Sequence, residues 1–147
     1  MRIPAMRPYF AYGSNLSLSQ MKARCPDSRR VEAMRVVLPG YRWFIYKGGH
    51  ANVEQLLGYC VEGALYELSE KDEKSLDQRE GVPNGTYERK FLEILRDGVP
   101  LKALVYVAPS TDPGTAGKCY AEIVMEGARD ANLSEEYVAR VLRPQLA

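Results

Sequence analysis

Residues 58–68 alternate strongly, and neither set of alternate positions is purely polar. Successive side chains of a strand point to opposite faces of a sheet, so odd and even positions would line different faces. The odd positions include Tyr59, Val61 and Leu65, and the even positions include Tyr66 and Leu68. A strand that is apolar on both faces is typical of the centre of a sheet or of a barrel wall, because both of its faces are covered.

The segments around this strand give a mixed order of elements rather than a repeat. Pro26, residues 39–40 and Gly81 separate them, because proline and glycine interrupt helices and strands. The order predicts an α/β (α+β) fold: a small, mixed, mainly antiparallel β-barrel of about six strands, flanked by helices. The predicted strands are residues 7–11, 30–38, 41–46, 58–68, 86–95 and 101–107, and the predicted helices are residues 17–24, 69–80, 120–131 and a last helix that Ser134 caps.

Length and charge limit the kind of partner. The chain has 147 residues, which suits one domain with its own core, so we expect residues 1–147 to form a single domain. Its formal net charge is +1, and no run of Lys and Arg is longer than Arg29-Arg30. This balance gives no general electrostatic reason to bind nucleic acid or a membrane, and the sequence has no run of about 18 apolar residues. We expect a small neutral or zwitterionic ligand, whereas the oligomeric state cannot be predicted.

The cysteines predict free thiols. Cys25, Cys60 and Cys119 are odd in number and widely spaced, and no Cys-x-x-Cys pair or Cys/His cluster is present. We therefore expect a reducing, cytoplasmic location and neither a metal site nor a cofactor. Cys60 lies within the alternating strand, which predicts a small core residue.

Residues 9–16 (YFAYGSNL) form a short apolar run that stops at Gly13-Ser14-Asn15 and leads into a helical pattern. Gly13 can adopt a positive φ and allows a ligand to approach the main chain, and Ser14 and Asn15 can bond locally. Successive N–H groups followed by the start of a helix, which Ser17 or Ser19 could cap, favour anions or carbonyl oxygens. The same residues also suit a plain connection between a strand and a helix.

Glu80 is the candidate acid or base. It ends a charged helix that Ser69 caps, with Asp72 placed to complete a capping box, and Gly81 follows it. The negative end of the helix dipole and any burial would both raise the pKa of its carboxyl group, which suits proton transfer. The alternative is a solvated carboxylate at a helix end.

The two segments together closely resemble the γ-glutamylcyclotransferase family, which has an AIG2-like fold. The resemblance rests on residues 9–16 and on the pattern Leu-Asp-x-x-Glu-Gly-Val-x-x-Gly-x-Tyr over residues 76–87. Residues 48–53, which lead into the predicted central strand, and residues 120–128 resemble the family in lesser ways. The resemblance runs from about Tyr9 to Val141, nearly the whole chain.

This resemblance implies a small mixed barrel with one cavity at the Gly13-Ser14-Asn15 loop. It also implies release of 5-oxoproline from γ-glutamyl compounds, by attack of the substrate α-amine on its own γ-carbonyl. Glu80 would then act first as base and later as acid, with no cofactor, because the substrate supplies the nucleophile. The substrate-binding residues implied are Tyr9, Phe10, Ala11, Tyr12, Gly13, Ser14, Asn15, Leu16, Tyr87 and Tyr120.

Other functions stay open at this point. The same cavity could serve amide cleavage or acyl transfer with water or an external amine, or binding without chemistry. A Cys119 nucleophile would make an amidase or acyltransferase, and His50 is expected to be a surface or hydrogen-bonded residue. The leaving amine is undetermined, and we expect the loops at residues 47–55 and 108–118 to select it.

Overall fold

The strands form one sheet that closes on itself. The computed structural model describes residues 6–146, and these contain six strands: β1 (Arg7–Ala11), β2 (Arg29–Arg30), β3 (Val36–Ile45), β4 (Ala51–Leu68), β5 (Glu88–Arg96) and β6 (Val99–Val107). Their order is β1-β6-β5-β3-β4-β2, and β1 also pairs with β4, which closes the ring. β1 runs parallel to β6 at Tyr9 and Leu104, whereas the other pairings are antiparallel. The predicted mixed, mainly antiparallel barrel is confirmed.

The central strand is longer than its alternation predicted. β4 starts at Ala51 rather than at residue 58, so most of the expected loop at residues 47–55 is strand. The alternation fails in the middle because residues 56–59 bulge out opposite Gly40, where the register of β3 and β4 shifts. The Leu57 side chain is 95% exposed there. Cys60, at the end of this bulge, is exposed, so its prediction as a core residue was wrong.

The break between the two strands predicted at residues 30–38 and 41–46 lies earlier in the chain, between β2 and β3. Only Arg29 and Arg30 pair as β2, and β3 then runs unbroken through Pro39 and Gly40. Gly40 has φ +77°, which glycine adopts without strain, so the pair accommodates a bulge instead of a turn between strands.

Two helices follow the first and fourth strands. A short 3₁₀ helix (Ser14–Leu16) leads into α1 (Leu18–Arg24). Of the two cap candidates it is Ser17, whose hydroxyl accepts from the Gln20 N–H, and not Ser19 that caps α1. α2 (Glu70–Arg79) is capped by Ser69, but the capping box is incomplete: the Asp72 carboxylate accepts instead from Asp27 N–H and Ser28 Oγ. The Ser28 hydroxyl takes the Ser69 N–H that Asp72 was expected to bind. A second 3₁₀ helix, Val82–Asn84, follows α2.

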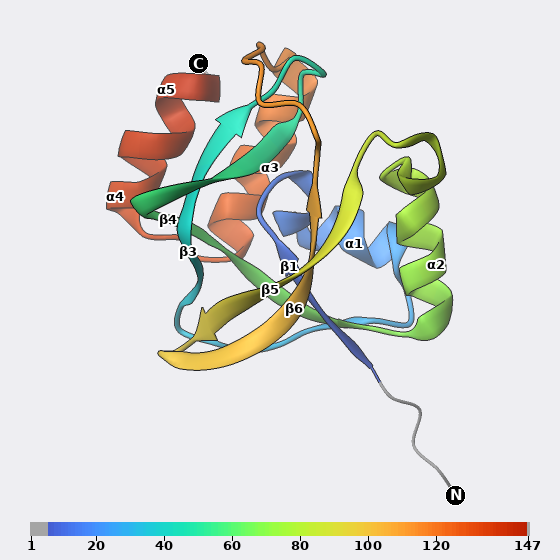
Figure 1. Cartoon of the computed structure of the whole chain (residues 1–147). Helices are drawn as coiled ribbons and strands as arrows, with labels where there is room; N and C mark the ends of the chain where they lie inside the picture. The colour runs from blue at the N-terminus through green and yellow to red at the C-terminus, as the bar shows by residue number, and fades with distance from the viewer. Residues whose placement is uncertain (1–5, 147) are drawn as a thin grey trace, which may run out of the picture.

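The C-terminal helices cover the opposite side of the barrel from α2 (Figure 1). α3 (Lys118–Asp130) is followed by α4 (Glu135–Tyr137), a π-helical stretch (Val138–Leu142) and α5 (Arg143–Leu146). Ser134 caps α4, as predicted, through its bond from Tyr137 N–H. Within residues 6–146, no helix combines the length and apolar character that crossing a membrane demands.

β1 joins two groups of buried side chains. Phe10 packs in one group with Val124 of α3, and Tyr9 and Ala11 pack in the other with Leu76 of α2. Alternate side chains of a strand face opposite ways, so this one strand contacts both helical layers. The loop that follows β1 is therefore anchored from both sides.

Candidate active site

A cavity of about 370 Å³ lies where the connection from β1 to α1 meets the end of α2 and one face of α3. Of the residues expected at the site, it is lined by Tyr9, Tyr12, Gly13, Ser14, Asn15, Glu80, Tyr87 and Tyr120. Residues from segments far apart in the sequence are thus brought to one place.

Three of the expected substrate-binding residues lie elsewhere. Phe10, Ala11 and Leu16 are fully buried and are not part of the cavity lining. Phe10 points to the other face of β1 from Tyr9, and Leu16 packs with the buried groups behind the loop. These side chains support the loop from the core. Alternation along β1 places Phe10 on the face opposite Tyr9, whereas Ala11 shares the face of Tyr9 but is fully buried in one group with Leu16.

The side chain of Asn15 organises the cavity. Asn15 is buried, and its Nδ2 donates to the Tyr9 hydroxyl at 2.9 Å and to Glu80 Oε1 at 3.1 Å. Its Oδ1 accepts from Gln20 Nε2 and from Arg24 Nη1, both at 3.0 Å. Both hydrogens and both lone pairs of the amide are used, so its orientation is fixed.

Glu80 is a half-buried carboxylate at the end of α2. It occupies the C-cap position, and Gly81 after it has φ +68°, the left-handed conformation predicted for the residue that ends this helix. Burial raises the pKa of the Glu80 carboxyl, and the Arg24 charge and the Asn15 hydrogen bond oppose that rise. A raised pKa makes a carboxylate a better base toward an amine, and the same group can later return the proton as an acid.

Of the five tyrosines that line the cavity, three have hydroxyls that bond to the main chain. Tyr12 donates to the Tyr106 carbonyl at 2.5 Å, and Tyr87 donates to the Ala51 carbonyl at 2.7 Å. Tyr120 differs because its oxygen accepts from the Ala51 N–H at 2.9 Å, which leaves its own proton available. Burial raises the pKa of Tyr120 to about 12, so the hydroxyl is neutral and can donate to an oxygen in the cavity.

Gly13 is needed for close approach and not for an unusual φ. Its φ is −120°, so the positive φ considered from the sequence is not used. A Cβ at this position would meet the Tyr120 hydroxyl at 2.9 Å and the Ala51 Cβ at 3.1 Å. The 3₁₀ helix starts at the next residue, and the first N–H groups of a helical turn have no preceding carbonyl to accept them.

His50 is exposed, as the sequence predicted, and it also lies at the lining of the cavity. Its ring lies 4.8 Å from the ring of Tyr120, edge to face. Burial, with a smaller effect of the Arg24 charge, lowers its pKa, so the imidazole is neutral at neutral pH. Cys119 is exposed and lies outside the lining.

Sequence reasoning missed Gln20 and Arg24, which join the site from α1. The two residues are four apart and therefore share a helix face. That spacing is visible in the sequence, but it does not reveal that this face turns toward the cavity. The lining also includes Arg79, Thr86, Tyr106 and Ile123.

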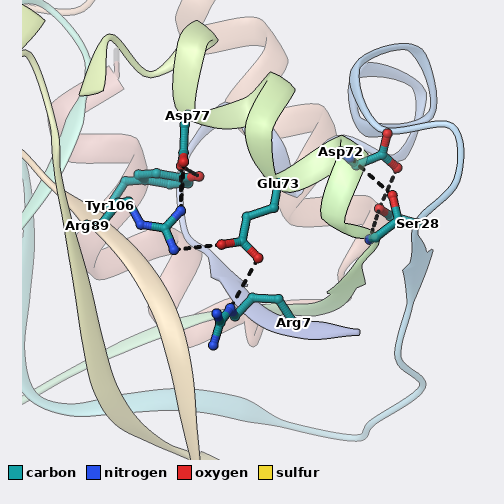
Figure 2. Close-up of polar contacts among 8 residues, drawn as sticks. Arg7, Ser28, Asp72, Glu73, Asp77, Arg89 and Tyr106 are labelled. Carbon is teal, nitrogen blue, oxygen red and sulfur yellow. Dashed lines mark hydrogen bonds and ion pairs between the residues drawn. The ribbon is translucent and has the colours of Figure 1, made fainter. Parts of the chain in front are cut away.

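A charged network fixes the helix that carries Glu80 (Figure 2). Arg89 of β5 donates through Nη1 to both carboxylate oxygens of Asp77, at 2.8 and 2.7 Å, and through Nη2 to Glu73 at 2.6 Å. The Tyr106 hydroxyl donates to Asp77 at 2.6 Å, and Arg7 Nε donates to Glu73 at 3.1 Å. α2 is thus bound to β1, β5 and β6, one turn before its end at the cavity.

Acidic, histidine and cysteine side chains of residues 6–146 form no group of three that could hold a metal ion. The polar side chains at the cavity are instead one carboxylate, hydroxyls, two amides, an imidazole and guanidinium groups. This set can bind a zwitterion and move a proton.

Comparison with known proteins supports the likeness inferred from the motifs. A model of the AIG2-like family matches residues 60–141. The γ-glutamylcyclotransferase of Mus musculus is 26% identical over 141 residues, which cover 88% of this chain and 73% of that protein. The Homo sapiens enzyme is 26% identical over 138 residues, with the same coverage. A solved structure of a γ-glutamyl cyclotransferase superposes with a TM-score of 0.84 at 22% identity, over 92% of this chain and 88% of that one.

Proposed function

The chain belongs to the AIG2-like family, and from that membership we propose that it is a γ-glutamylcyclotransferase that releases 5-oxoproline from a γ-glutamyl amino acid or amine. The curated relatives from mouse and human, which carry this name, support the proposal. The observation that carries it is Glu80, a half-buried carboxylate held by Asn15 at the edge of a tyrosine-lined cavity.

The reaction needs one proton carrier and one folded substrate. The α-nitrogen of the substrate forms a bond to its γ-carbonyl carbon, and the bond from that carbon to the leaving nitrogen breaks. Glu80 takes the proton that the α-nitrogen loses and gives it to the leaving nitrogen. The cavity must hold the α-nitrogen about 3–3.5 Å from the γ-carbonyl carbon, which removes most of the entropic barrier to ring closure.

The developing oxyanion needs fixed donors. The first N–H groups of the 3₁₀ helix, of which the one at Ser14 also approaches the Tyr120 oxygen, and the proton of the Tyr120 hydroxyl would serve as these donors. Donors that are already oriented stabilise charge in a transition state without reorganisation. Tyr12 and Tyr87 would shape the cavity, because their own protons are bound to carbonyl oxygens.

We also propose that the reaction takes place in the cytoplasm. Cys60 and Cys119 are exposed free thiols, which suits the cytoplasmic placement expected from the sequence.

Replacement of Glu80 tests the proposal. We expect Glu80→Gln to lower kcat by about 10²- to 10⁴-fold, because glutamine keeps the size and removes the base. The assay detects 5-oxoproline by mass spectrometry, with a panel of γ-glutamyl amino acids and γ-glutamyl amines. Glu70→Gln is the matched control, because Glu70 lies on the exposed side of the same helix and pairs with Lys74.

A blocked substrate separates cyclisation from hydrolysis. Acetylation of the α-nitrogen removes the internal nucleophile, so the wild-type protein should release no amine from it. Amine release from the acetylated substrate, or normal turnover by Glu80→Gln, would contradict this mechanism. Ligand-induced thermal stabilisation without any product would identify a binding protein instead.

A further inference from the structure

Arg24 is a cation in the cavity with no acidic partner of its own. It ends α1 and lines the cavity, half-buried. No ion pair among residues 6–146 includes it. Its one side-chain hydrogen bond within that range runs from Nη1 to Asn15 Oδ1, so Nε and Nη2 remain free. A guanidinium group in this state is a ready partner for a carboxylate, which it can bind through two parallel bonds.

The position of Arg24 relative to Glu80 is set by one amide. Asn15 Oδ1 accepts from Arg24 at 3.0 Å, and Asn15 Nδ2 donates to Glu80 at 3.1 Å. The two charged groups therefore flank a single side-chain amide and have opposite charge. An amino acid head group has the complementary arrangement, because its ammonium and carboxylate groups are attached to one carbon.

We propose that Arg24 binds the α-carboxylate of the glutamyl group, while Glu80 meets the α-amine on the same carbon. This inference rests on the proposed function, and it adds a residue that positions the nucleophile. With both charged groups of the head group held, the α-nitrogen has a defined direction, and the γ-carbonyl of the side chain must fold back toward it. Arg24 would thus contribute to orientation more than to proton transfer.

Two other roles must be separated from this one. Arg24 could act only on the protein, by holding Asn15 in place. It could also bind a carboxylate on the leaving amino acid, a role open to Arg79 as well, which is more exposed at the same cavity. The three roles differ in how the Kd should respond to Arg24→Gln when the α-carboxylate or the leaving-group carboxylate of the ligand is replaced by an amide.

Binding to a variant that cannot turn over gives the test. In the Glu80→Gln background, calorimetry would measure the Kd of γ-glutamylalanine, of its α-carboxamide and of its leaving-group carboxamide. We expect Arg24→Gln to raise the Kd of γ-glutamylalanine and of the leaving-group carboxamide by about 10- to 100-fold, the value of a charge-assisted bond pair. The Kd of the α-carboxamide should change by less than about threefold, since that ligand has no α-carboxylate for Arg24 to bind.

Controls on the same helix and at the same position sharpen the result. Lys22→Gln removes one positive charge from an exposed position of α1 and should leave all three Kd values unchanged. Arg24→Lys keeps the charge but loses the planar fork, so it should give an intermediate Kd for γ-glutamylalanine.

The outcomes are separable. An equal rise in Kd for all three ligands on Arg24→Gln would show that Arg24 only supports Asn15. If Arg24→Gln instead weakened binding of the α-carboxamide but not of the leaving-group carboxamide, Arg24 would bind the carboxylate of the leaving amino acid. Either result, or no binding of γ-glutamylalanine, overturns the inference. Arg24-dependent binding in a protein that makes no 5-oxoproline would refute the proposed function and keep the carboxylate site. Release of 5-oxoproline together with Kd values that Arg24→Gln leaves unchanged would refute the carboxylate site and keep the proposed function.

Discussion

At the scale of single residues, Glu80 is held where its charged form is disfavoured. Burial raises the pKa of its carboxyl above the ordinary value, and the Arg24 charge and the Asn15 bond reduce that effect. A group whose pKa is raised on folding binds its proton more tightly in the native state than in the unfolded chain. Ionisation of Glu80 therefore costs stability as the pH rises through the interval between the two pKa values.

We expect Glu80→Gln to be more stable than the wild type at neutral pH. Glutamine is neutral at all pH values and keeps the size of the side chain, so the cost of ionisation disappears. The difference in melting temperature should shrink as the pH falls and vanish near the pKa of an unfolded glutamate, about 4.3. Scanning calorimetry of both proteins between pH 4 and 8 measures it. Equal melting temperatures across this range would show that the Arg24 charge and the Asn15 hydrogen bond fully offset the cost of ionising Glu80 in the folded protein.

The sequence predicted Glu80 and the Gly13-Ser14-Asn15 loop but not the polar contacts between them. Asn15 was expected to contribute a main-chain N–H, whereas its side chain makes four hydrogen bonds, one of them to Glu80. Which side chain of a loop turns inward depends on the packing of α1 against α2, and no local pattern contains that information. Arg24 was missed for the same reason.

At the scale of secondary structure, α2 depends on its polar face. Asp77 binds Arg89 and the Tyr106 hydroxyl across to the barrel (Figure 2). The Arg89 and Asp77 side chains are only 24% and 23% exposed, so this pair is screened less than a surface ion pair.

Asp77→Ala should destabilise the protein by about 1–3 kcal/mol, because Arg89 and Tyr106 lose a charged acceptor in a partly buried place. Turnover should fall as well, since Glu80 lies less than one turn further along. Urea unfolding measures the free energy. Lys74→Ala, which removes an exposed pair with Glu70, should cost no more than about 0.5 kcal/mol. Equal losses in the two variants would mean that the network does not fix α2.

Element boundaries were predicted well where residues act locally and poorly where partner strands decide. Ser17, Ser69 and Ser134 cap the helices that the sequence assigned to them. β3 and β4 were misjudged, because Gly40 and residues 56–59 form a bulge that exists only when the two strands pair. A sequence pattern read from one strand cannot contain that register.

At the scale of the whole molecule, α3 packs directly on the loop that forms the cavity. A Cβ at Gly127 would meet the Leu16 Cβ and the Ser17 N, each at 2.5 Å. Only glycine allows the helix to lie this close to the main chain after Gly13. The C-terminal part of the protein therefore sets the position of the N-terminal loop.

Gly127→Ala should lower stability by about 1–3 kcal/mol, even though alanine favours a helix, because the main chain of Ser17 must move. Activity should fall too, since the loop is displaced. Urea unfolding and the 5-oxoproline assay measure the two effects. Gly117→Ala is the control: no atom lies within 4 Å of its added Cβ, and we expect a loss below about 1 kcal/mol. A Gly127→Ala protein as stable and active as Gly117→Ala would disprove this close packing.

The overall architecture could be predicted only by combining local patterns with the family resemblance. The patterns indicated strands and helices, but the closure of the sheet depends on the pairing of β1 with both β4 and β6. The parallel contact between Tyr9 and Leu104 joins residues from opposite parts of the sequence. Such pairing leaves no periodic signal within either strand.

That same closure has a consequence for the order of events during synthesis. Tyr9 pairs with Tyr66 and with Leu104, so β1 leaves the ribosome long before its partner strands exist. The adjoining residues 12–16 can take their final positions only after β6 and α3 have followed. The first part of the cavity to be translated is therefore the last to become ordered.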